Sequence, residues 1–231
     1  MNSNYNTSVS SLPAEDYLWL LDRGYPDGPS LKLIGDRYRL GRSKRNILRR
    51  GISPSSEAGA RRVLLTRDVR ERSLAVDGHN VLLTIANYLA GRPVFLANDG
   101  LLRDDGALHG RVHNSDVMNH SVDLLRDALT ASRAASVCIV LDRPVSHSGE
   151  LAGAIRVALG PGFAGRLAVR LEDSADGALR RADAEVISSA DSAVIDAAGK
   201  PIYDLARHSL EAAFGFVPQP ASDLLQRPAK G

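Results

Sequence analysis

Four short apolar runs in this chain are each followed by an acid, and acids in that position are the first candidates for chemistry. The run Leu74–Val76 ends in Asp77, which is followed by Gly78, His79 and Asn80. This is the pattern of a buried parallel strand that turns directly into a helix. Asp before Gly is also ordinary turn chemistry, so Asp77 alone could be only a turn residue. The other runs are Ser136–Leu141 before Asp142, Leu167–Leu171 before Asp173 and Asp176, and Glu185–Ser189 before Asp191.

Acids at the ends of parallel strands meet at one edge of the sheet, which is where sites are built in open α/β folds. Carboxylates gathered there repel one another, and a divalent cation relieves that repulsion. Mg²⁺ and Mn²⁺ prefer such oxygen ligands. One or two of these ions can activate water and stabilise the charge on a phosphodiester. The spacing therefore predicts a metal site made by Asp77, Asp142, one of Asp173 and Asp176, and Asp191.

The elements that would position these acids alternate between strands and helices from about Val63 onward. Helices are expected after Asp77 as far as Leu89, and then over Ser115–Arg133, Leu151–Leu159 and Tyr203–Phe214. The Asp-Gly pairs at 99–100 and 105–106 indicate tight turns or a hairpin. The alternation predicts an α/β fold, a three-layer α/β/α arrangement with a mainly parallel sheet.

The chain before this region is polar and then basic. Lys and Arg far outnumber acids between Lys32 and Arg50. Arg42, Lys44 and Arg45 lie on an expected helix, where they suit contact with a phosphate backbone. A solvated helix face, or pairing with the protein's own acids, explains the same residues equally well. The expected divisions are a disordered tail over 1–13, a small basic helical domain over 14–60 that ends in a linker or exposed loop over 51–60, the α/β domain over 61–217, and a Pro-containing tail over 218–231.

The composition is that of an ordinary globular protein. The 231 residues are 44% hydrophobic and carry a formal charge of only +2, so no global field draws the chain to nucleic acid. A single cysteine, Cys138, excludes a disulfide framework and favours a reducing compartment. No apolar run reaches the length of a membrane span, and the polar start does not resemble a signal peptide. We expect a cytoplasmic protein with no membrane partner, and a homo-oligomer is compatible with the sequence.

Four segments also carry a family resemblance. AVDGHNVLLT, CIVLDRP, DSADGALRRAD and EVISSADSAVI resemble, in this order, the acidic motifs of PIN-like and NYN-type ribonuclease domains. In addition, the basic segment followed by VDGHNVLLT resembles an uncharacterised prokaryotic family, in which a small basic N-terminal domain of unknown function precedes a PIN-like region. The first resemblance implies a PIN-like fold over about residues 72–210, and the second covers most of the chain.

The PIN-like resemblance implies a role for individual residues. Asp77, Asp142, Asp176 and Asp191 would be the catalytic and metal-binding acids, and Asn80 would lie beside the metal. The chain departs from the family pattern where Ala190 separates Ser189 from Asp191. Gly177 also stands where a second acid is often present, and Asp183 in a later Ala-Asp pair could serve instead. His79 could touch a substrate phosphate, although a histidine there more often hydrogen-bonds the turn.

These observations lead to one hypothesis and two rivals. We expect a metal-dependent endoribonuclease that uses Mg²⁺ or Mn²⁺ at the four aspartates, while Asn80, His79, Arg42, Lys44 and Arg45 hold RNA. The first rival is a non-catalytic RNA- or ribosome-binding module on a degenerate PIN-like fold. The second is a phosphatase or other small-molecule hydrolase that uses the same metal edge.

Overall fold

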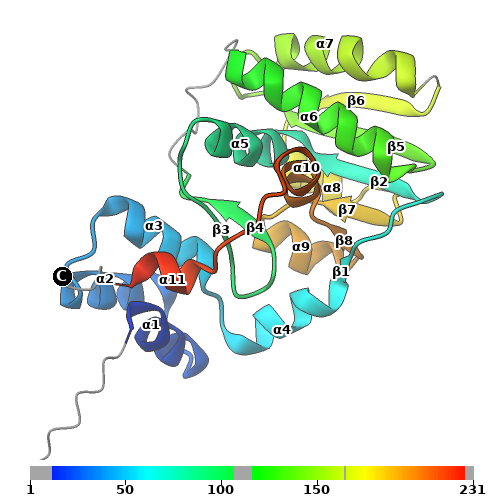
Figure 1. Cartoon of the computed structure of the whole chain (residues 1–231). Helices are drawn as coiled ribbons and strands as arrows, with labels where there is room; N and C mark the ends of the chain where they lie inside the picture. Colours follow the sequence, from blue (N-terminus) through cyan, green and yellow to red (C-terminus); the bar gives the residue numbers. More distant parts are fainter. Residues whose placement is uncertain (1–11, 107–115, 164, 227–231) are drawn as a thin grey trace, which may run out of the picture.

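A parallel sheet forms the centre of the structure, a computed structural model that describes residues 12–106, 116–163 and 165–226 (Figure 1). Its strands are β1 (Leu65–Thr66), β2 (Ser73–Asp77), β5 (Ser136–Asp142), β6 (Leu167–Glu172), β7 (Val186–Ser188) and β8 (Ile202–Tyr203). They lie in the order β1-β8-β7-β2-β5-β6, and each neighbouring pair is parallel. Strand β2 lies between β7 and β5, and it pairs with β5 so that Ser73 is opposite Ser136 and Asp77 is opposite Val140. All four runs that the sequence marked as strands are strands of this sheet.

Helices cover both faces of the sheet. They are α5 (Gly78–Leu89), α6 (Asp116–Ser132), α7 (Ser148–Leu159) with a 3-10 turn at Gly160–Gly162, α8 (Ala175–Arg180), α9 (Ser192–Ala198) and α10 (Leu205–Phe214). Leu74 and Val76 of β2 pack with α5, α6, α7 and α10 in one core. Ala75 of β2 and Val140 of β5 face the other way, into a core shared with α8 and α9. This alternation along the strands confirms the expected three-layer α/β/α arrangement with a parallel sheet.

The N-terminal segment is helical, as expected, but residues from other parts of the chain complete its core. It consists of α1 (Pro13–Asp22), α2 (Asp27–Arg37), α3 (Arg42–Gly51) and α4 (Ser55–Leu64). Its core includes the fully buried ring of Phe95. That core also includes Leu225 from a short helix, α11 (Ala221–Leu225), close to the other end of the chain. Figure 1 shows α11 beside α1 and α3.

Two expected loop regions are therefore wrong. The segment 218–231 was predicted to be a tail, yet α11 buries Ala221 and Leu225 because the N-terminal helices leave an apolar face for them. The sequence predicts a linker or exposed loop over 51–60, yet α4 begins at Ser55 and runs directly to β1. Residues 1–11 of the expected N-terminal tail and 227–231 of the C-terminal one lie outside the described residues.

A hairpin packs against both the helical unit and the α/β unit. Strands β3 (Val94–Leu96) and β4 (Leu102–Asp104) pair antiparallel, as the Asp-Gly signals indicated. One side of the hairpin contributes Phe95 to the N-terminal core, and Leu102 packs into the core under α5 and α6. Over the residues that the structure describes, no helix has both the length and the apolar character needed to cross a membrane.

Candidate functional site

Asp77 occupies the carboxyl end of β2 and caps the first turn of α5. Its Oδ1 accepts a hydrogen bond from the backbone N–H of Asn80 at 3.2 Å, and its Oδ2 accepts one from the Ser189 hydroxyl at 3.0 Å. Only 5% of the residue is exposed. The pKa of Asp77 is raised to about 7, mainly by burial and also by the charges of Asp142 and Asp176, while the two hydrogen bonds lower it in part. Asp77 is therefore a buried carboxyl group whose pKa is raised in part by the charges of two other acids.

Asp142 lies at the end of the neighbouring strand, β5. Its Oδ1 accepts a hydrogen bond from the backbone N–H of Ala175, at 2.8 Å, which fixes the start of α8. Its own backbone N–H donates to Nδ1 of His79, at 3.1 Å. Because this nitrogen accepts a hydrogen bond, it carries no proton there, and its 3.5 Å approach to Asp142 Oδ2 is not an ion pair. This contact of His79 is thus with the backbone at the end of β5 rather than with its own turn.

The structure distinguishes the three candidates for the third acid. Asp176 lies in the first turn of α8. Its pKa is raised mainly by burial and, to a smaller extent, by the charges of Asp191 and Asp142. Asp173 instead points to solvent, with 91% of its side chain exposed, and pairs with Arg143 at 3.3 Å. Asp183 is also exposed and lines a separate cavity, of about 370 Å³, beside Cys138. Asp176 is therefore the member of the acidic cluster.

Asp191 caps α9 just beyond β7. Its Oδ1 accepts hydrogen bonds from the backbone N–H groups of Ala193 and Val194, at 2.8 and 3.2 Å. The extra residue before it, Ala190, donates its N–H to Oδ1 of Asn80 at 2.9 Å. The Ser189 hydroxyl accepts from the Asp191 N–H at 3.1 Å while it donates to Asp77. Ala190 thus lets Ser189 face Asp77 and still places Asp191 at the helix start.

The four aspartates form an electrostatically connected group at one edge of the sheet, which we call the acidic cluster (Asp77, Asp142, Asp176 and Asp191). Their oxygen atoms are of the kind that Mg²⁺ and Mn²⁺ prefer. Burial, and to a smaller extent the repulsion between the carboxylates, raises the pKa values of Asp77 and Asp176, and a cation would relieve that repulsion. Within the described residues, however, no three acidic, histidine or cysteine side chains converge closely enough to form a ready-made metal site. The donor chemistry fits a divalent cation, and binding one would require the carboxylates to draw together.

The basic residues predicted to hold RNA have different environments. Arg45 donates from Nε to the Leu40 carbonyl at 2.8 Å and pairs with Asp36 at 2.7 Å. Lys44 donates to the carbonyl of Gln226 at 3.2 Å. Arg42 is exposed at the start of α3. The structure therefore gives Arg45 and Lys44 partners within the protein and leaves Arg42 facing solvent.

Two further residues of this region carried weak sequence signals. Ser189 joins Asp77 to the Asp191 loop, and only its place in the run Ser-Ser-Ala-Asp could have suggested it.

Asp204 follows β8 and caps α10, and burial raises its pKa to about 6. The helix expected from Tyr203 begins instead at Leu205, because Ile202 and Tyr203 form a strand too short to show a pattern.

Fold and site together define an α/β protein with an acidic cluster at the carboxyl edge of a parallel sheet, preceded by a small helical unit. The chain belongs to the family described as a domain of unknown function, DUF5616, which matches residues 66–208. A second family, a protein of unknown function named DUF434, matches residues 11–63. The chain is also 26% identical over 200 residues to the uncharacterised protein MJ0935 of Methanocaldococcus jannaschii, covering 85% of this chain and 94% of that protein. No solved structure matches the chain.

Proposed function

We propose that this protein is a metal-dependent endoribonuclease of PIN-like type that uses the acidic cluster. One observation carries the proposal: each of Asp77 and Asp176 has its pKa raised by burial and, to a smaller extent, by the charges of other members of the cluster. Acids that weaken one another's ionisation in this way are characteristic of functional sites, where a cation or a proton is exchanged. The position of the cluster at the carboxyl edge of parallel strands supports the same assignment.

The residues would divide the work according to their environment. Asp142, Asp176 and Asp191 are only partly buried or exposed, so they would supply the oxygens that bind Mg²⁺ or Mn²⁺. Such a cation supplies an activated water and stabilises the charge that develops on the phosphodiester. Asp77, held by Asn80 and Ser189, would fix the innermost side of the site. RNA would approach from solvent, with Arg42 among the cations that contact its phosphates.

The test is a titration of the purified full-length protein with Mn²⁺, followed by an assay for cleavage of mixed-sequence RNA. We expect Asp176→Asn to weaken Mn²⁺ binding and to abolish cleavage. Asp173→Asn is the matched control, since Asp173 stands three residues before Asp176, between β6 and α8, but pairs with Arg143 at the surface. Wild-type protein that neither binds Mn²⁺ nor cleaves RNA, or equal losses in the two variants, would contradict the proposal.

One observation favours a second candidate, a non-catalytic RNA-binding module. The carboxylates of Asp77, Asp142 and Asp191 already accept hydrogen bonds from the protein, and no three acidic, histidine or cysteine side chains of the described chain converge. A degenerate site would have this property. The same assay separates the two, because a module would bind RNA in a salt-sensitive way without turnover and would be unaffected by Asp176→Asn.

A further inference from the structure

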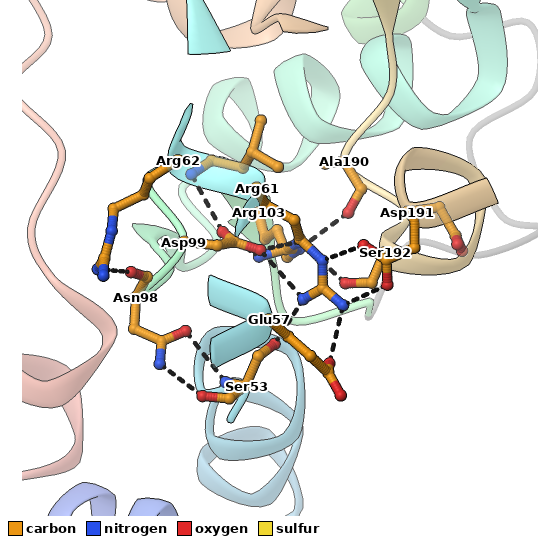
Figure 2. A network of polar contacts seen from close by, with 12 residues as sticks. Ser53, Glu57, Arg61, Arg62, Asn98, Asp99, Arg103, Ala190, Asp191 and Ser192 are labelled. Atoms are coloured by element: carbon orange, nitrogen blue, oxygen red, sulfur yellow. Dashed lines mark hydrogen bonds and ion pairs between the residues drawn. The ribbon is translucent and has the colours of Figure 1, made fainter. Parts of the chain in front are cut away.

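A buried pair of opposite charges in the hairpin lies next to the acidic cluster and faces the loop after β7 (Figure 2). Asp99, in the turn of the hairpin, has no exposed surface, and Arg103 is only 4% exposed. The guanidinium of Arg103 donates to both carboxylate oxygens, from Nη1 at 2.8 Å and from Nη2 at 2.7 Å. This bidentate contact fixes the plane of the guanidinium group.

The remaining donors of Arg103 point at the loop that carries Asp191. Nε donates to the carbonyl of Ala190 at 2.9 Å, and Nη2 also donates to the hydroxyl of Ser192 at 3.2 Å. Ala190 and Ser192 are the two neighbours of Asp191 in the chain. Figure 2 shows Arg103 between Asp99 on one side and this loop on the other.

The same loop is held from its opposite side by α5. Asn80 accepts the N–H of Ala190, and Asp77 accepts the hydroxyl of Ser189. The peptide groups on either side of Ala190 are therefore bound in two directions, by Arg103 and by Asn80. A loop held in this way gives Asp191 one position relative to Asp77.

Stability alone is a weak reason to bury such a pair. The loss of hydration of a buried carboxylate and guanidinium offsets most of their attraction, and apolar residues of similar volume often stabilise a protein as well or better. A buried arginine whose remaining donors reach the backbone beside a site acid is better explained by the geometry that it imposes.

We propose that Arg103, oriented by Asp99, is the positioning residue that sets the location of the Asp191 carboxylate in the acidic cluster. The inference that Asp191 serves a metal rests on the proposed function, whereas the positioning of the loop does not. Arg103 does not touch the reacting atoms. It acts through Ala190 and Ser192, as the outer contacts of metal sites commonly act through the ligands.

Arg61 of α4 provides a matched comparison. It is also buried, 2% exposed, and its Nη1 lies 3.6 Å from the same Asp99 carboxylate. Its bidentate partner is Asp196, which it reaches from Nε at 2.7 Å and from Nη2 at 2.6 Å. Arg61 therefore shares the buried charge of Asp99 and contacts α9, but it does not hold the residues that flank Asp191.

The experiment compares Arg103→Met, Arg103→Lys and Arg61→Met in the full-length protein. Amide hydrogen exchange is measured at Ala190, Asp191, Ala193 and Val194, whose N–H groups are bonded within this loop and helix start. Mn²⁺ affinity and thermal unfolding are measured on the same samples. We expect Arg103→Met to accelerate exchange at these amides and to weaken Mn²⁺ binding by about 10- to 100-fold. Arg103→Lys, which keeps the charge but only part of the contacts, should lie between it and the wild type.

Arg61→Met should lower the unfolding temperature while it leaves loop exchange and Mn²⁺ affinity close to the wild type. Equal effects of Arg61→Met and Arg103→Met, or unchanged loop exchange in both Arg103 variants, would overturn the assignment. If the wild type binds no Mn²⁺, the proposed function fails, and exchange at the four amides still decides whether Arg103 positions the loop. If Arg103→Met does not fold, Arg103→Lys supplies the same comparison.

Discussion

The hydroxyl of Ser189 donates to Oδ2 of Asp77 at 3.0 Å, although the two residues are 112 positions apart in the chain. This contact joins the ends of β2 and β7, which are neighbours in the sheet. It brings the loop of Asp191 to the one acid of the cluster that is buried. The arrangement of the acidic cluster therefore depends on parallel pairing between strands that are distant in sequence.

Asp77 should make the stability of the protein fall as the pH rises from about 4 toward neutrality. Its pKa is raised from 3.8 to about 7 in the folded state, so the folded protein holds a proton that the unfolded chain releases. The free energy of unfolding should decrease between about pH 4 and pH 7, by at most about 4 kcal/mol from this group. Asp77→Asn, which cannot ionise, should lose this part of the pH dependence.

Denaturant unfolding of wild type and Asp77→Asn at pH 5 and pH 8 measures the effect as a difference between the two proteins. The difference removes contributions from other acids, such as Asp68, whose hydrogen bonds with Arg70 lower its pKa to about 2. Asp77→Asn should be more stable than the wild type at pH 8. Parallel pH profiles for the two proteins would show that Asp77 ionises normally.

Mn²⁺ should stabilise the protein more strongly at pH 8 than at pH 5. A cation bound by the acidic cluster competes with the protons that burial and mutual repulsion keep on Asp77 and Asp176. At a concentration about 100 times the dissociation constant, the expected gain in unfolding free energy is about 2.7 kcal/mol. Thermal unfolding with and without Mn²⁺ at both pH values checks this, and a shift that does not depend on pH would point to binding elsewhere.

Gly78 should tolerate no side chain. A Cβ at this position would lie 2.6 Å from Leu141 Cδ2 and 2.8 Å from Ile139 Cγ2, in the core under α5. Gly78→Ala should therefore destabilise the protein by about 1–3 kcal/mol. Gly153→Ala is the control, because a Cβ there meets nothing within 4 Å in the middle of α7, and it should stabilise by about 1 kcal/mol. Equal effects of the two substitutions on the unfolding free energy would contradict the close packing of Gly78.

The α/β fold could be predicted from the sequence because β2 and β5 are continuous apolar runs followed by turn residues. Asp77 and Asp142 were identified for the same reason, since each ends such a strand. The identity of the third acid depended on tertiary contacts: Asp173 and Asp176 differ only in whether the chain turns them toward Arg143 or toward Asp142. The spacing of the residues alone left this choice open, and only the PIN-like resemblance pointed to Asp176.

The regions that were predicted wrongly are those whose structure comes from distant partners. The sequence over 51–60 is rich in Ser and Gly, yet α4 forms and buries Arg61, which pairs with Asp196 across the fold. Residues after Val217 have a composition typical of a tail, and α11 gains its order from the apolar face of the N-terminal helices. In both cases tertiary burial outweighs weak local propensity.

Leu225 tests the assignment of α11 to the N-terminal core. Its side chain is almost fully buried among the N-terminal helices, so Leu225→Ala should lower the unfolding free energy by about 2–5 kcal/mol. Val217→Ala removes apolar atoms that are 82% exposed just before α11, and should change stability by less than about 0.5 kcal/mol. If both substitutions are neutral in denaturant unfolding, α11 does not contribute to the core.

Arg42 and Arg49 test whether the basic helix α3 binds RNA. Both are exposed, and in the part of the chain that the structure describes neither has an acidic partner within ion-pair distance, whereas Arg45 is paired with Asp36. The double substitution Arg42→Met and Arg49→Met should weaken RNA binding and reduce the slope of log affinity against log salt by about 0.7 for each cation that contacts a phosphate. It should leave thermal unfolding unchanged.

Arg45→Met is the control for this test. It should instead lower the unfolding temperature, because it removes contacts to Asp36 and to the Leu40 carbonyl. An unchanged salt slope in the double variant, measured by fluorescence anisotropy with single-stranded RNA, would exclude α3 from the RNA interface.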